Sequence, residues 1–323
     1  MHNFKRIVKV VIPVLLAIGI LVGLDFLLYP CTFMRNDIHM VTTEEKQDIF
    51  LGTSHGMTNI DPVVVESETG KSGHNLCVGG EYGIDAYYLT KLMIEKQDPK
   101  RIIYEVDPGY FITEKEPGNN YLLFYHEFPM SKAKVQYFFD AQMKCDFRSV
   151  LFPWYEYPLK QELQNMKKTV YQKWNHNYDV SYLKGKTQEY HESGFIERYP
   201  VAPKQMDTSI TRVFTEEAVK AQNMEYLEKL IQLCKEEGIE FVAVTTPIPD
   251  AALEQYPENY NAAWDYFQKF FEEHEVQYLN FNREYYELFP HGLESYTDYD
   301  GHMHGKAATH FSKILGILLK DYE

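Results

Sequence analysis

The sequence predicts an α/β fold with three α/β/α layers and a mostly parallel sheet, preceded by a membrane-spanning helix. Three observations predict this fold. Short apolar runs that end at glycine or proline alternate with segments whose apolar residues recur at helical spacing. A long aromatic-rich stretch interrupts this alternation once. The first thirty residues are apolar and weakly basic, whereas the remainder of the chain is acidic.

The charge of the chain narrows the classes of function. The 323 residues carry 32 Lys and Arg against 47 Asp and Glu, a formal charge of −15. Residues 1–30 carry +2, which leaves −17 for the rest. An acidic body argues against binding to a phosphate backbone, so we expect no nucleic-acid partner. The four cysteines show no CxxC spacing, which gives no indication of a zinc site or a disulfide framework.

Residues 10–28 are predicted to be a membrane anchor. This run of 19 residues carries one charge, Asp25, and as a helix it is roughly 28 Å long, enough to cross a bilayer core. Basic residues precede it, namely Lys5, Arg6 and Lys9. The positive-inside rule therefore predicts a single-pass protein of the cell membrane with a cytoplasmic N-terminus and an extracellular body. A cleaved signal peptide is the alternative, although residues 24–34 show no small-x-small cleavage pattern.

The strands are expected where short apolar runs meet turn residues. The run at residues 48–51 ends at Gly52, the run at 74–78 ends at Gly79 and Gly80, and the run at 101–106 is stopped by Pro108. Further strands are expected at residues 240–245 and 276–281. Because each run is only four to six residues long and is rich in apolar side chains, it fits a buried strand of a parallel sheet.

The helices are expected between these strands. Apolar residues follow helical spacing from 82 to 97, and Pro99 closes that segment. An amphipathic helix is expected from Thr215 to Glu237, with Gly238 just after its end. Residues 259–274 and 305–320 complete the set.

The chain is accordingly divided into four parts. Residues 1–30 form the cytoplasmic tip and anchor, 31–109 the first part of the α/β domain, 110–214 an insertion, and 215–323 the second part of the domain. The insertion is aromatic-rich and largely helical in expectation. It is interpreted either as a subdomain with its own aromatic core or as a lid whose aromatic faces stack on sugar rings.

The candidate catalytic residues all lie after the ends of predicted strands. In open α/β sheets ligands bind at the carboxyl ends of the strands. The first strand delivers Ser54, the second Gly79 and Gly80, and the third Asp107, while the loop at 298–305 precedes the last helix. We therefore expect a serine, a glycine pair, an acid and an Asp-His loop to meet at one edge of the sheet.

This set suits nucleophilic catalysis by serine. A serine hydroxyl needs an imidazole to take its proton and a carboxylate to orient that imidazole. The backbone N–H groups of Ser54 and of Gly79 or Gly80 are candidates for stabilising an oxyanion. Ser54 as an ordinary turn residue is the alternative.

At this point the chain resembles a known family. The successive segments DIFLGTSHG, HNLCVGGEYGIDAYYLTKLM, RIIYEVDP and DYDGHMHGKAATHFS resemble the SGNH (GDSL-type) hydrolase superfamily. They are most similar to its membrane-anchored cell-surface branch, which includes the D-alanyl transfer protein of teichoic acid modification and the alginate-type O-acetyltransferases. The resemblance covers residues 46–110 and 215–320.

The resemblance implies residue roles. Ser54 would be the nucleophile, Gly79 the second oxyanion-hole donor, and His302 the base, oriented by an aspartate just upstream. The family usually places that aspartate three residues before the histidine, where this chain has Tyr299. Asp300 is preferred because Asp-Gly-His keeps the loop tight, and Asp298 is the backup.

Two further residues belong to the possible rim of the site. Asp107 stands where the family often supplies an oxyanion-hole Asn, but a carboxylate cannot donate a hydrogen bond unless it is protonated. His55 adjoins Ser54 and is poorly placed to be its base. A metal site on His302, His304 and Asp300 is a weaker alternative, so neither a metal nor a cofactor is expected.

The function expected from these features is acyl transfer at the cell surface. The chain would be a serine O-acyltransferase or acyl esterase that modifies a polysaccharide or teichoic-type polymer through an acyl-Ser54 intermediate. The resemblance adds a membrane-bound O-acyltransferase as a possible partner that hands over the acyl group. A non-catalytic surface protein that binds glycans or supports assembly is the alternative.

Overall fold

A five-stranded parallel sheet forms the centre of the computed structural model, which describes residues 2–115, 124–156, 159–203 and 209–321. The strand order is β2-β1-β3-β6-β7. The strands are β1 (Asp48–Leu51), β2 (Gly73–Asn75), β3 (Arg101–Glu105), β6 (Glu240–Thr245) and β7 (Gln277–Asn280). Every pairing between neighbours is parallel, which confirms the predicted α/β class.

β2, β3 and β7 are shorter than their apolar runs predicted, and β2 differs most. β2 ends at Asn75, although the amides of Leu76 and Val78 still donate to carbonyl oxygens of the β1 segment at 2.8 and 2.9 Å. The Asn75 side chain accepts the N–H of Cys77 at 2.9 Å and donates to the carbonyl oxygen of Gly56 at 2.9 Å. The side chain of Asn75 thereby replaces one step of the backbone ladder.

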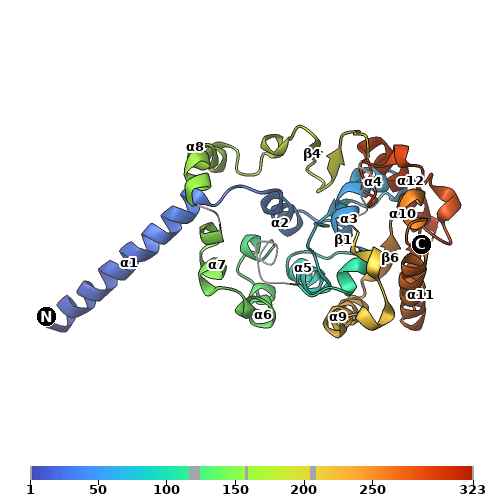
Figure 1. Ribbon diagram of the computed structural model, residues 1–323. Coiled ribbons are helices and arrows are strands. Elements are labelled where there is room, and N and C mark those ends of the chain that lie inside the picture. The colour runs from blue at the N-terminus through green and yellow to red at the C-terminus, as the bar shows by residue number, and fades with distance from the viewer. Residues whose placement is uncertain (1, 116–123, 157–158, 204–208, 322–323) are drawn as a thin grey trace.

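Two separate hydrophobic cores lie on opposite faces of the sheet. Side chains alternate along each strand, so Ile49 and Leu51 of β1 belong to one core and Phe50 to the other. The first core is covered by α5 (Gly83–Lys96), α9 (Ala221–Glu237) and α11 (Pro257–Glu273). The second is covered by α4 (Pro62–Thr69) and α12 (Gly305–Asp321). Helices thus cover both faces of the sheet (Figure 1).

The start of α9 corrects one predicted boundary. The helix begins at Ala221, six residues after the predicted Thr215. Residues Glu216–Ala218 form a separate 3₁₀ turn, for which Thr215 supplies no side-chain cap. The amide of Lys220 then donates to the carbonyl oxygen of Phe111 at 2.8 Å. This contact between distant segments holds the chain extended before the helix.

The region between residues 110 and 214 is helical at one end and stranded at the other. Its helices are α6 (Lys132–Asp140), α7 (Phe147–Leu151) and α8 (Leu159–Asn175), and its hairpin is β4 (Gln188–Tyr190) with β5 (Ile196–Arg198). α6 packs on α5, and α8 packs on the N-terminal helix. β5 instead contacts α3 (Ser54–Asn59) and α12, so the hairpin adjoins the predicted site.

The N-terminal helix α1 (His2–Leu28) projects away from the rest of the protein (Figure 1). Its segment Lys9–Leu28 has a mean hydropathy of 2.7 and is mostly exposed, although Leu28 at its end is buried. This segment is long and apolar enough to cross a membrane. A signal sequence near an N-terminus has the same length and composition. A short link joins it to α2 (Phe33–Thr43), which packs on α5.

A buried ion pair joins three elements at the amino end of the sheet. Arg101 of β3 is fully buried and donates to both carboxyl oxygens of Asp48 in β1, at 2.7 and 3.1 Å. It also donates to the carbonyl oxygen of Leu319 in α12 at 2.9 Å.

We expect Arg101→Ala to lower the free energy of unfolding by about 3–5 kcal/mol, because the Asp48 carboxylate would remain buried without its partner. Denaturant unfolding of the full chain in detergent, followed by near-UV circular dichroism, measures this loss. Lys100→Ala is the matched control, since Lys100 pairs with exposed Asp98 and such surface pairs contribute about 0–1 kcal/mol. Equal effects of the two substitutions would contradict the role of the buried pair.

Candidate active site

Ser54 lies at the first residue of α3, directly after strand β1. Thr53 caps this helix, and its side chain accepts the N–H of His55 at 3.4 Å. Gly52 has a φ of +140°, and a Cβ there would lie 2.6 Å from the carbonyl oxygen of Glu105. Because no other residue fits that close approach, glycine is required for the turn that places Ser54 at the carboxyl edge of the sheet.

Two buried carboxyl groups hold this turn. Glu105, at the end of β3, accepts the N–H of Thr53 at 2.7 Å and its hydroxyl at 2.8 Å. Glu81 accepts the N–H of Gly52 at 3.1 Å. Burial raises the pKa of both carboxyl groups, and that of Glu81 most. Sequence analysis missed both residues, although an acidic side chain at the end of the apolar run RIIYEV was a usable indication.

Ser54, His302 and Asp298 form a continuous chain of hydrogen-bond contacts. The Oγ atom of Ser54 lies 2.8 Å from Nε2 of His302. Nδ1 of His302 lies 2.9 Å from the nearer carboxyl oxygen of Asp298. Since a carboxylate only accepts, Nδ1 carries the proton, which leaves Nε2 free to accept from the Ser54 hydroxyl. This arrangement is the one that a serine nucleophile with a general base requires.

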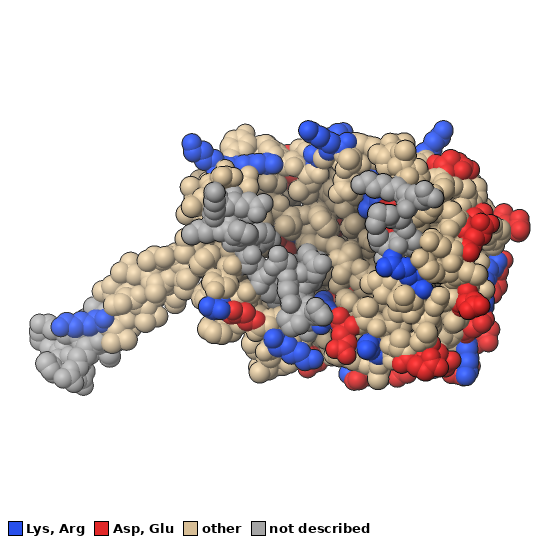
Figure 2. Space-filling view, viewed as in Figure 1, with Lys and Arg blue, Asp and Glu red and all other residues tan. Residues whose placement is uncertain are grey.

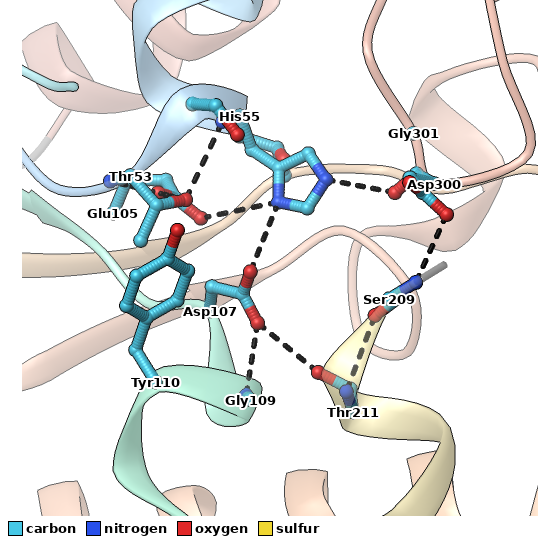
Figure 3. A network of polar contacts seen from close by, with 12 residues as sticks. Thr53, His55, Glu105, Asp107, Gly109, Tyr110, Ser209, Thr211, Asp300 and Gly301 are labelled. Atoms are coloured by element: carbon cyan, nitrogen blue, oxygen red, sulfur yellow. Dashed lines mark hydrogen bonds and ion pairs between the residues drawn. The ribbon is translucent and has the colours of Figure 1, made fainter. Parts of the chain in front are cut away.

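Asp298, and not the preferred Asp300, is the partner of His302. The Asp298 carboxylate accepts the backbone N–H groups of Asp300 at 3.1 Å and His302 at 3.2 Å, so the loop curls around that side chain. Gly301 follows with a φ of +108°. The Asp300 side chain consequently points elsewhere and accepts the N–H of Ser209 at 3.0 Å (Figure 3). The expectation that Asp-Gly-His places the carboxylate on the ring was wrong for this reason.

Arg198 fixes the charge of Asp298. Its guanidinium donates to the Asp298 carboxylate at 2.7 Å and to the Thr297 hydroxyl at 3.0 Å. Burial alone would raise the pKa of Asp298, but the hydrogen bond from His302 and the Arg198 charge hold it well below its usual range. Arg198 comes from β5, inside the region predicted as a helical insertion. Sequence analysis did not identify it, because nothing in its local sequence connects it with the loop a hundred residues later.

His55 forms a second pair with Asp107 beside the first. Its Nε2 lies 2.7 Å from the carbonyl oxygen of Asp300, and its Nδ1 lies 3.5 Å from a carboxyl oxygen of Asp107 (Figure 3). Burial would lower the pKa of His55, but the Asp107 carboxylate outweighs it and raises the pKa to about 9. His55 is therefore a cation at neutral pH. Its ring centroid lies 4.7 Å from that of His302.

Asp107 does not act as a hydrogen-bond donor here. Its other carboxyl oxygen accepts the N–H of Gly109 at 2.9 Å and the hydroxyl of Thr211 at 3.1 Å. The His55 contact lowers the pKa of Asp107 despite burial, so the group is ionised. Asp107 thus caps the turn after β3 and neutralises His55.

The two glycines of the second strand end take different positions. A Cβ on Gly79 would lie 3.5 Å from the Cβ of Ser54, so the Gly79 backbone lies against the serine. The N–H of Gly80 donates to the hydroxyl of Tyr110 at 3.1 Å. The predicted pair is therefore brought to the site, but the Gly80 amide is directed at Tyr110.

An open cleft of about 840 Å³ begins at these glycines. Tyr82 and Tyr110 form part of its wall, with ring centroids 5.1 Å apart in an edge-to-face arrangement. Its remaining lining residues are Gly79, Gly80, Ile112, Thr113, Glu114, Lys115, Ile210 and Lys220. This volume falls within the range of small-molecule sites.

The metal alternative loses one of its proposed ligands. Ligand atoms of Asp298, Asp300 and His302 lie within 4.8 Å of one another. His304, however, points to the carbonyl oxygen of Glu294 at 2.9 Å. Both ring nitrogens of His302 already contact Ser54 and Asp298, so a bound ion would have to displace one of them.

Comparison with known proteins identifies no family for the chain, so a function can be assigned only from the residues of the site. The chain matches no protein-family model and no curated protein.

We expect His55→Gln to raise the pKa of His302. In the wild type, burial and the neighbouring His55 cation both hold the pKa of His302 below its usual 6.5, against the hydrogen bond to Asp298. Removing the cation makes protonation of His302 easier, so its titration should move to higher pH. Nuclear magnetic resonance titration of ring-labelled histidine measures the shift.

His304→Gln is the control for this titration, because the His304 ring faces a carbonyl oxygen away from His302. An unchanged or lower pKa of His302 in His55→Gln would show that His55 is not charged in the wild type.

Proposed function

We propose that the protein is a serine-dependent acyl-transfer enzyme that works through an acyl-Ser54 intermediate. The observation that carries the proposal is the contact series from Ser54 Oγ through the His302 ring to Asp298, at 2.8 and 2.9 Å. A serine without such partners stays protonated at neutral pH and is a poor nucleophile.

The reaction proceeds in two halves. Ser54 Oγ attacks the acyl carbonyl carbon while its proton passes to Nε2 of His302. The tetrahedral intermediate collapses, and the leaving group departs with that proton. In the second half an acceptor hydroxyl gives its proton to Nε2 and attacks the carbonyl carbon of the Ser54 ester. The bond from that carbon to Oγ then breaks, and Oγ takes the proton from Nε2, which restores the serine. A polymer hydroxyl as acceptor makes the protein an O-acyltransferase, and water makes it an esterase.

The oxyanion of the intermediate would be stabilised by backbone N–H groups. Ser54 begins α3, so its amide lies at the helix end where backbone donors lack intrahelical acceptors. Gly79 lies against Ser54 without a side chain between them. Asp298 balances the positive charge that His302 acquires in the same step.

The layout supports the resemblance to SGNH hydrolases. The serine follows β1, the glycine pair follows β2, and the Asp-His loop precedes α12, all at one edge of a parallel sheet. The chain differs from the family pattern in placing its aspartate four residues before the histidine and in having Asp107 in the usual position of Asn. The proposal includes the three-layer α/β/α arrangement that is typical of that family.

The substrate and the location are proposed with the function. α1 would anchor the protein in the cell membrane, with the N-terminus in the cytoplasm and the site outside. A cell-surface polysaccharide or teichoic-type polymer is the acceptor that the resemblance suggests, and a membrane-bound O-acyltransferase is the suggested acyl donor. These two partners rest on the resemblance alone.

A fluorophosphonate probe tests the proposal directly. The Ser54 oxygen attacks phosphorus and expels fluoride only if the serine is activated. We expect the wild type to be labelled, Ser54→Ala to lose all labelling, and His302→Gln to lose nearly as much, because the two residues act as a unit. Intact-mass spectrometry and the near-UV spectrum report labelling and folding together. A folded wild type that resists labelling would favour a non-catalytic surface protein.

The two aspartates provide a matched comparison. We expect Asp298→Asn to slow labelling on the order of 10²–10⁴-fold, because an amide neither fixes the His302 tautomer nor balances its charge. Asp300→Asn should slow it by less than about tenfold, since the Asp300 side chain contacts Ser209 rather than the ring. Labelling rates at equal probe concentration measure both. The reverse order would assign the orienting role to Asp300.

A further inference from the structure

Part of the 110–214 region lies beside the apolar segment of α1. Residues Leu151–Trp154, where α7 passes into the next turn, share a cleft of about 300 Å³ with one side of the helix. The lining residues on α1 are Ile18, Leu21, Val22 and Asp25. Lys173 of α8 donates to the carbonyl oxygens of Asp25 and Phe26 at 2.9 and 3.0 Å.

This packing conflicts with a body that stays wholly outside the bilayer. Ile18 lies ten residues before the end of α1 at Leu28, about 15 Å along the helix axis. If the bilayer contained only the part of α1 that precedes Ile18, residues 9–17 of the apolar segment would lie in it. That is roughly 13 Å of helix, whereas the hydrocarbon core is about 30 Å thick. A spanning α1 therefore carries residues 151–154 into the membrane with it.

The surface of this region is suited to that position. Large apolar side chains are exposed there, among them Phe139, Met143, Phe147, Leu151, Tyr171 and Trp174. Phe147 is 65% exposed, and Leu151, which lines the cleft against α1, is 60% exposed. Aromatic and apolar side chains of this kind are enriched where proteins meet the bilayer interface.

Charge favours a lipid surface over a second protein. Residues 128–178 carry eight Lys and Arg against four Asp and Glu, a charge of +4 in a chain of −15. In the view of Figure 2, acidic side chains gather at the end of the body remote from α1. A basic, apolar surface continuous with a spanning helix fits a bilayer that contains anionic lipids.

We propose that α7 and the turn after it, Phe147–Tyr155, insert into the outer leaflet beside α1, so that the protein holds the membrane at two places. The chain would enter the hydrocarbon boundary at Phe147 and Leu151 and leave it after Trp154, with Lys173 of α8 at the level of Asp25. This inference extends the proposed anchor and is independent of the chemistry of Ser54.

Tryptophan fluorescence in brominated vesicles tests the insertion. The chain has three tryptophans, and Trp264 is buried in the α/β body. The double variant W174F/W264F reports on Trp154, and W154F/W174F reports on Trp264. Each full-length variant is reconstituted into phosphatidylcholine and phosphatidylglycerol vesicles, with and without bromine on the acyl chains. We expect a large loss of Trp154 emission in the brominated vesicles and little loss for Trp264.

The outcomes separate the insertion from the anchor and from the chemistry. Trp154 quenched no more than Trp264, in protein that resists carbonate extraction, would overturn the insertion and leave the anchor intact. Protein released by carbonate would overturn both. Fluorophosphonate labelling of Ser54 in the same variants verifies folding and does not affect the quenching or the extraction result. Strong selective quenching of Trp154 would establish the insertion even if Ser54 proved unreactive.

Discussion

The hydrogen bonds from Thr53 to Glu105 are the interaction on which the candidate site depends. They join the turn after β1 to the end of β3, and both lie in the interior, where each is stronger than it would be in water. Without them Gly52 and Thr53 would not be held in the backbone conformation from which α3 begins at Ser54. Glu105 also faces His55 at 4.0 Å, so the same carboxyl group links the turn to the second histidine.

The arrangement of charge around His302 follows from two opposed pairs. Arg198 and Asp298 lie on one side of the ring, and His55 and Asp107 lie on the other. Each pair is close to neutral as a whole, which limits the cost of burying four charges near one another. Within that balance the imidazole has a carboxylate at Nδ1 and a cation across its face. The carboxylate orients the ring, and the cation disfavours protonation of the ring.

The sequence was sufficient to locate the five strands of the parallel sheet and the residues that follow them, but it did not predict the hairpin of β4 and β5. β1 and β6 have the predicted bounds, because a buried parallel strand is largely apolar and each of these runs ends close to a residue that stops the ladder, Gly52 or Pro247. The same pattern located Ser54, Gly79 and His302. It could not decide between Asp298 and Asp300, since that depends on which carboxylate the loop amides fold around. It also could not find Arg198, whose role exists only through contact between distant segments.

The packing of α1 against α8 and of α2 against α5 would hold the body at a fixed distance from a membrane that α1 spans. A domain on a long flexible linker can take many positions relative to the membrane. A domain joined to its membrane helix by a short link, with the helices on both sides of the link packed, can only rotate about the membrane normal. With α1 in a bilayer, the Ser54 edge would sweep a ring at one distance from the lipid surface. If Ser54 acylates hydroxyl groups as proposed, only those at this distance from the membrane would be modified, and those closer or further away would not, whatever their chemistry.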